Sequence, residues 1–216
     1  MKKGIVVLFF VCSGSIVVAQ PSKQAMKQLI NENLKFAVSQ YKVMMKQTPA
    51  DVMPRSFNKE KNELVTSNTR WWCSGFYPAT LWLLYSGTRD AEIRAEAEKR
   101  LALQESMKTY TGNHDLGFMI YCPFGNAYEI TKKPEYKEVI LTAAETLSKR
   151  YRPSIQAIQS WDSNANFKCP VIIDNMMNLE LLEWATKNGG DKKYHDIAVN
   201  HSNTTIKNQF RDDNST

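Results

Sequence analysis

Cysteine, histidine and glycine are scarce in this sequence. Its 216 residues include 4 Cys, 3 His and 9 Gly. No Cys/His pair has the spacing of a zinc site, and the histidines are not paired at helical intervals, so we predict that the protein uses no metal and no other cofactor. Beyond the leader described below, Cys73, Cys122 and Cys169 are an odd number at wide spacings, which favours buried free thiols over a disulfide framework.

Basic clusters and long apolar runs are also missing. The 28 Lys and Arg are interspersed with 22 Asp and Glu, giving a formal net charge of +6 without the basic stripe of a nucleic-acid-binding protein. We therefore expect no nucleic-acid partner. No stretch after the first twenty residues approaches the roughly 18 to 20 apolar residues of a spanning helix, which predicts no integral membrane segment.

The N-terminus has the pattern of a secretory leader. Lys2 and Lys3 precede an apolar run over 5–11, and small residues follow up to Ala19. We predict a signal peptide over 1–19 and export to the periplasm or the exterior. A lipoprotein anchor at Cys12 is the alternative, but the bulky residues before Cys12 disfavour it. Residues 20–216 are then expected to form one domain or part of a larger one.

Apolar residues recur at intervals of three and four through most of the chain, which is typical of amphipathic helices. The predicted helices span 21–46, 78–85, 91–109, 116–130, 135–151, 174–188 and 192–210. The polar, proline-containing and asparagine-rich stretch 47–69 predicts an irregular loop. Alternation of period two is nearly absent, with its best example at 155–161, so the predicted fold class is all-α.

A helix, polar turn and helix pattern recurs over 83–92, 127–136 and 182–194. Such hairpins cannot bury their apolar faces alone, so they stack into an open solenoid or a closed toroid. Irregular segments before Trp71, His114 and Asp174 favour the toroid, because they place unusual residues at the same end of successive hairpins. We expect that end to be the binding face.

Adjacent tryptophans mark the first of these segments. Trp71 and Trp72 precede Gly75 and Pro78 at a helix entrance. Neighbouring side chains point in different directions, so one indole is a candidate to line a cleft, where it would stack on the apolar face of a sugar ring. Core packing is the more frequent use of a tryptophan and is the alternative.

Two aspartates carry the chemistry that the other segments suggest. Asp115 follows His114 at the start of an apolar helix, where a simple helix cap is the alternative. Asp174 lies in the apolar run 171–179, where a carboxylate is costly unless it is hydrogen-bonded, paired, protonated or capping a helix. At equivalent ends of two hairpins in a ring, the two acids would face each other as paired carboxylates that act on glycosidic bonds do.

Three segments, 72–83, 114–118 and 172–182, together resemble the unsaturated glucuronyl hydrolases, glycoside hydrolase family 88. The stretch 201–205 also resembles a family motif, and the similarity runs from about Thr69 to the C-terminus. The resemblance implies an (α/α)6 barrel, a double ring of helices. Because family members are nearly twice as long, this sequence is expected to form an incomplete N-terminal portion of the ring.

The resemblance also implies an activity. Family members release 4,5-unsaturated glucuronic acid from the nonreducing end of oligosaccharides that lyases produce, such as glycosaminoglycan fragments. An acid protonates C4, water adds at C5, and the hemiketal falls apart. Asp174 matches the general acid and base, and Asp115 matches the second essential carboxylate. The residues that match substrate-binding positions are His114, one of Trp71 and Trp72, and Trp161.

Two alternatives remain open at the level of sequence. The unsaturated rhamnogalacturonyl hydrolases share the barrel and the hydration chemistry but act on pectin fragments, and the motif at 114–118 argues against them. A non-catalytic helical-repeat binding module would need stacked hairpins but no paired carboxylates.

Overall fold

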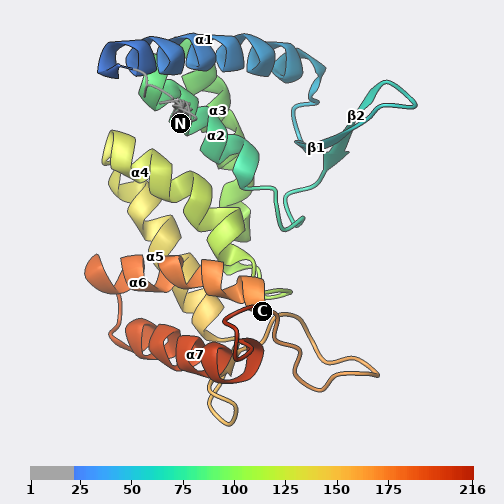
Figure 1. Ribbon diagram of the computed structural model, residues 1–216, viewed down its shortest axis with the longest axis vertical. Coiled ribbons are helices and arrows are strands. Elements are labelled where there is room, and N and C mark those ends of the chain that lie inside the picture. The colour runs from blue at the N-terminus through green and yellow to red at the C-terminus, as the bar shows by residue number, and fades with distance from the viewer. Residues whose placement is uncertain (1–21) are drawn as a thin grey trace, which may run out of the picture.

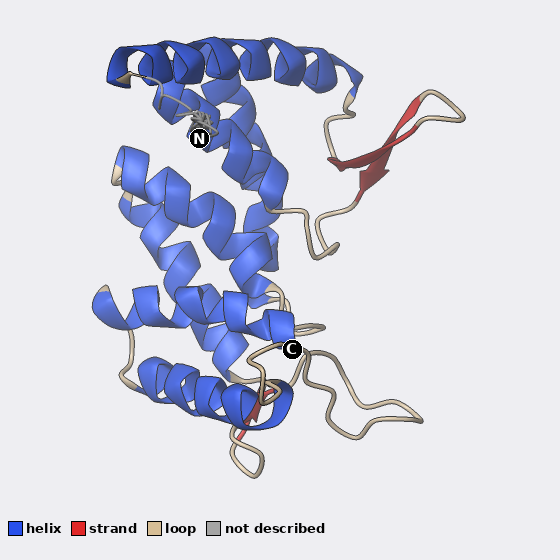
Figure 2. Cartoon of the chain, in the orientation of Figure 1, coloured by secondary structure: helices blue, strands red, loops and turns tan. Residues whose placement is uncertain are grey.

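A computed structural model describes residues 22–216, so the predicted signal peptide and Cys12 lie outside the described residues. The described chain is predominantly helical (Figure 2), and the predicted all-α class is confirmed. The α-helices are α1 (Lys23–Gln47), α2 (Phe76–Thr88), α3 (Ala91–Gln104), α4 (Asn126–Thr131), α5 (Pro134–Ser148), α6 (Leu179–Lys187) and α7 (Lys193–Gln209). Within 22–216, no helix combines the length and apolar character needed to cross a bilayer.

Successive helical hairpins stack along the long axis of the molecule (Figure 1). The turns that the repeated sequence pattern predicts each contain a residue with positive φ: Arg89 (φ 60°) after α2, Lys132 (φ 56°) after α4 and Gly189 (φ 95°) after α6. Asp90 caps α3 by accepting hydrogen bonds from two backbone N–H groups of its first turn. Each turn reverses the chain within a hairpin. The irregular connectors join one hairpin to the next, and they therefore lie at the opposite end of the hairpins.

The core runs between the stacked hairpins. Trp82 of α2, Phe124 of the helical segment η2 (Gly117–Gly125) and Leu147 of α5 are fully or almost fully buried. Burial of a side chain of this size contributes roughly 1.5–3 kcal/mol. Among residues 22–216, Cys73, Cys122 and Cys169 are free thiols as predicted, but they are half-buried rather than buried.

The prediction of an irregular loop over 47–69 is wrong. Two antiparallel strands, β1 (Met53–Asn58) and β2 (Glu63–Ser67), form a hairpin that projects from the helices (Figure 1). Its turn uses Asn58, whose side-chain oxygen accepts two backbone N–H groups, and Asn62 at φ 51°. The hairpin is largely exposed, so it lacks the alternating apolar pattern by which a strand is usually detected.

Two predicted helices begin with tighter or wider turns than an α-helix. The segment predicted at 116–130 starts as a π-helix, η2 (Gly117–Gly125), which contains Pro123 and leads into α4. The one predicted at 174–188 starts as a 3₁₀-helix, η3 (Ile173–Asn178). A further 3₁₀ turn, η1 (Glu105–Thr109), ends the segment predicted at 91–109. Such departures are frequent at functional sites.

The predicted extended connector at 155–161 contains a short strand. β4 (Ala157–Ile158) pairs with β3 (Tyr151–Arg152), and a single antiparallel bridge joins Asn113 to Trp161. These contacts bring the connectors of two hairpins into one backbone network.

Candidate active site

Backbone hydrogen bonds join three connectors at the end of the hairpins opposite the turns. The His114 N–H donates to the Ser160 carbonyl oxygen at 2.9 Å, and the Ser160 N–H donates to that of Pro170 at 2.8 Å. The Ile172 N–H donates to Ser160 Oγ at 3.1 Å. The starts of η2 and η3, about 60 residues apart in sequence, are thereby held beside one connector.

Glycines allow these segments to approach closely. The Gly117 N–H donates to Asn178 Oδ1 at 2.9 Å, and a Cβ at Gly117 would lie 2.7 Å from the Asn178 Cα. A Cβ at Gly75 would lie 2.1 Å from the Phe118 carbonyl oxygen. No side chain fits at either position. The chain after the two tryptophans, η2 and η3 therefore meet at one place.

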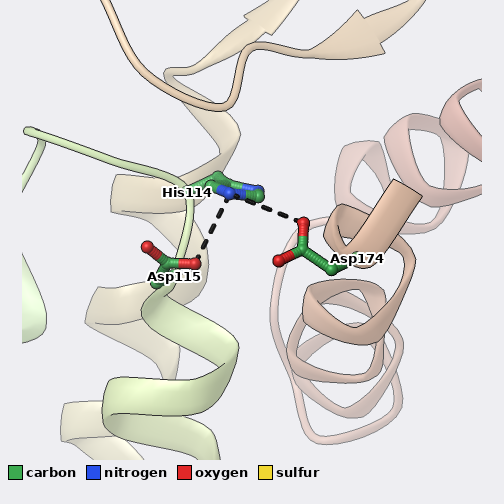
Figure 3. A group of neighbouring side chains, drawn as sticks. All are labelled: His114, Asp115 and Asp174. Atoms are coloured by element: carbon green, nitrogen blue, oxygen red, sulfur yellow. Dashed lines mark ion pairs between the residues drawn. The ribbon is translucent and has the colours of Figure 1, made fainter. Parts of the chain in front are cut away.

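The two predicted acids lie on either side of His114 (Figure 3). His114 Nε2 is 3.4 Å from Asp115 Oδ1 and 3.9 Å from Asp174 Oδ1. One ligand atom from each of the three residues lies within 4.8 Å of the others. Carboxylates from two different hairpins thus share one small space.

All the site residues predicted from sequence line one hollow of about 430 Å³, which we call the carboxylate hollow. Its walls are Arg70, Trp71, Trp72, Asn113, His114, Asp115, Trp161, Ile172 and Asp174. Trp71, Trp72 and Trp161 are 36%, 44% and 39% exposed. Both adjacent indoles therefore border the hollow, and the alternative of ordinary core packing does not describe them.

The carboxylates differ in burial. Asp115 is 8% exposed, and burial raises its pKa; the nearby Asp174 also raises it, while His114 and Arg150 oppose the rise. The Asp174 side chain is 43% exposed, although its Oδ1 is buried and accepts no hydrogen bond from the described residues. Within residues 22–216 the Asp174 carboxyl is therefore partly exposed, although the apolar run 171–179 that contains it is of a kind that is normally buried.

The helix-cap alternative fails for both acids. The residues at the cap positions of η2 and η3 are Leu116 and Ile172, and neither segment has a side-chain cap hydrogen bond. Asn113 performs the local turn function instead, because its Oδ1 accepts the Asp115 N–H at 3.0 Å. Both carboxylates are left available to other partners.

His114, Asp115 and Asp174 also form a group of nitrogen and oxygen donors that is compact enough to hold a cation. Such groups of acids are common without an ion. The sequence-based prediction of no metal stays a prediction.

The sequence assigned no role to Arg70, which lines the hollow, or to Asn175 and His201, which support it from η3 and α7. Asn175 Nδ2 donates to the Ile158 carbonyl oxygen at 2.7 Å, and the Ile158 N–H donates to His201 Nδ1 at 3.1 Å, so η3 and α7 clamp β4. Burial lowers the pKa of His201 to about 4, with a smaller contribution from His114. The two asparagines in the apolar run 171–179 could have indicated buried hydrogen bonds there, whereas nothing in the sequence distinguishes Arg70 from other surface arginines.

Known proteins resemble this chain in sequence and in structure. No family model matches the chain. Over 170 residues it is 44% identical to an unsaturated glucuronyl hydrolase of Formosa agariphila, covering 77% of this chain and 42% of that protein. Over 191 residues it is 31% identical to an unsaturated chondroitin disaccharide hydrolase of Streptococcus pyogenes, covering 86% and 47%.

A crystal structure of an unsaturated glucuronyl hydrolase specific for heparin superimposes with a TM-score of 0.81 at 36% identity, covering 86% of this chain and 50% of that one. The chain belongs to the unsaturated glucuronyl hydrolase family. This confirms the resemblance seen in the sequence and the prediction of an incomplete helical toroid. The chain spans about half the length of the curated relatives that it matches.

Proposed function

We propose that the protein containing this chain removes 4,5-unsaturated glucuronic acid from the nonreducing end of oligosaccharides that polysaccharide lyases release. The observation that carries the proposal is the position of Asp115, Asp174 and His114 within 4.8 Å of one another in a hollow bordered by tryptophans. Paired carboxylates supply an acid and a base to the same substrate, and the indoles offer faces on which a sugar ring stacks.

The proposed reaction is a hydration. Asp174 donates a proton to C4 of the vinyl ether, and water adds its oxygen at C5 while its proton passes to a carboxylate. The hemiketal then opens, and the rest of the oligosaccharide leaves from C1. Asp115 positions the water and shares the charge. Burial and the nearby Asp174 carboxylate raise the pKa of Asp115, so this carboxyl retains its proton at a higher pH than an isolated aspartate does.

Asp174→Asn tests the proposed acid in the full-length natural protein. Loss of a positioned general acid lowers the rate roughly 10²- to 10⁴-fold, so we expect the decay of the ultraviolet absorbance of the conjugated acid to slow by that order. The matched control is Asp196→Asn, because Asp196 lies on the exposed surface of α7 in a single ion pair with Lys192. A wild-type rate in Asp174→Asn would show that the acid is misassigned.

Glycosaminoglycan fragments are the proposed substrates, because curated relatives of this chain are named for unsaturated chondroitin disaccharides. Pectin-derived fragments are the alternative, and their hydrolases share the proposed hydration chemistry. Parallel assays on an unsaturated chondroitin disaccharide and an unsaturated rhamnogalacturonan disaccharide separate the two. A higher kcat/KM on the rhamnogalacturonan disaccharide would overturn the substrate assignment.

Export of the protein is also proposed, on the leader-like pattern of residues 1–19. Cell fractionation of the source organism tests it, with recovery of the protein in the periplasm or medium as the expected result. Retention of an uncleaved N-terminus in the cytoplasm would contradict it.

A further inference from the structure

A second and larger depression adjoins the carboxylate hollow. It has a volume of about 810 Å³ and lies between α1, the β1–β2 hairpin and the start of α2, and we call it the hairpin groove. Trp71 and Trp72 border both the groove and the carboxylate hollow. Aromatic side chains such as Tyr41, Phe57 and Tyr77 line the groove together with a few uncharged polar groups. Its size and lining suit several sugar rings.

Among the described residues that line this groove, Arg55 of β1 carries a charge and none is Asp or Glu. Its guanidinium carbon lies 4.0 Å from the centroid of a Trp71 ring. By contrast, Arg100 and Arg150 are paired with the carboxylates of Glu96 and Asp162. Stacking on an indole restricts the side chain while leaving the N–H edge of the guanidinium able to bind an anion.

Arg55 and the two acids lie in adjoining depressions that share Trp71 and Trp72. A terminal uronate in the carboxylate hollow has its next sugars attached at C1, and a saccharide that occupies both depressions passes over the shared indoles. We propose that Arg55, stacked on Trp71, binds an anionic group on the sugars that follow the reacting uronate. This inference rests on the proposed function. The anion is a sulfate on the second sugar or the carboxylate of the third, because a guanidinium binds either through paired hydrogen bonds.

Three substrates distinguish the sources of the anion: an unsaturated chondroitin disaccharide without sulfate, the same disaccharide with a 6-O-sulfate, and an unsulfated unsaturated tetrasaccharide. In the full-length natural protein, kcat and KM are measured for each. We expect Arg55→Ala to lower the ratio of kcat/KM for an anionic substrate to that for the unsulfated disaccharide about tenfold, mainly through KM, since a charge-assisted hydrogen bond is lost. Arg55→Lys, which keeps the charge but not the planar fork, should restore part of the ratio.

The matched control is Lys61→Ala, which removes one positive charge from the exposed turn of the same hairpin, outside the groove lining. It should leave both ratios unchanged, which excludes a general effect of charge. If wild type hydrolyses the substrates and Arg55→Ala leaves both ratios unchanged, the inference is overturned while the proposed function stands. If wild type hydrolyses none of them, the proposed function itself fails.

Discussion

Asp115 and Asp174 occupy the same hollow but meet solvent differently. Asp115 is buried beneath the start of η2, whereas the carboxyl of Asp174 is partly exposed. A buried carboxyl resists ionisation because the charged form loses hydration, and an adjacent carboxylate adds repulsion. The protein therefore keeps at its site a group that costs stability at neutral pH, as functional sites commonly do.

Replacing that group should stabilise the fold while removing activity. The pKa of Asp115 is raised in the folded state, so its ionisation destabilises the protein as pH rises above the ordinary range of aspartate, and the effect vanishes in acid. We expect Asp115→Asn to be more stable than wild type near neutral pH and no more stable at about pH 3, with loss of hydrolysis. Thermal unfolding across this range measures it.

Asp196→Asn, at an exposed position, should show no such pH-dependent gain. A variant Asp115→Asn that is less stable than wild type at neutral pH would contradict the assigned cost of burying this carboxylate.

The close approach of η2 and η3 is the main feature of the site at the scale of elements. Gly117→Ala would place a methyl group 2.5 Å from Asn178 Oδ1 and 2.7 Å from its Cα, so the two segments have to separate. Overpacking of this kind costs typically 1–3 kcal/mol. We expect a lower melting temperature together with a larger loss of kcat/KM, because Asp115 and Asp174 move apart.

Gly87→Ala is the matched substitution, since its new methyl group would meet only the end of the flexible Leu34 side chain. It should retain nearly wild-type activity. Equal losses of activity in both variants would show that the approach at Gly117 does not set the site geometry.

His201 ties α7 to the connector that carries Trp161. Its folded-state pKa of about 4 lies below the ordinary histidine value of 6.5, so the unfolded chain takes up a proton first as pH falls. Stability should decline from about pH 6.5 to pH 4 by up to about 3 kcal/mol. In His201→Gln this part of the decline should be absent from the pH dependence of urea unfolding, whereas His195→Gln, at an exposed histidine, should retain it.

Large apolar side chains lie exposed on several elements of the molecule, among them Phe36 (65%), Leu83 (55%), Met177 (65%) and Ile206 (58%). Exposed apolar surface promotes association in water. The 216-residue chain expressed alone should therefore self-associate with rising concentration, as measured by sedimentation velocity. The combined substitutions Leu83→Gln and Ile206→Gln should shift it toward monomer, and an unchanged distribution would show that other surfaces drive association.

Much of the architecture was readable because it depends on local interactions. Helical periodicity placed most helices, and polar turns with Asp90 and Gly189 marked the reversals. The β1–β2 hairpin was missed because few of its side chains are buried, and burial is what imposes an alternating pattern. The π-helix η2 and the 3₁₀-helix η3 were predicted as ordinary α-helix, because their geometry depends on contacts with each other rather than on neighbours in sequence.

The sequence by itself determined the helical class and the repeat of hairpins, and it predicted the two acids, because spacing and residue type are local properties of the chain. Only the tertiary structure decided that Asp115 is more buried than Asp174, that both lie beside His114, and that Arg55 stacks on Trp71. These features depend on which segments, distant in sequence, come into contact. Those contacts determine how far each side chain is buried and which charges lie beside it, and so its electrostatic free energy.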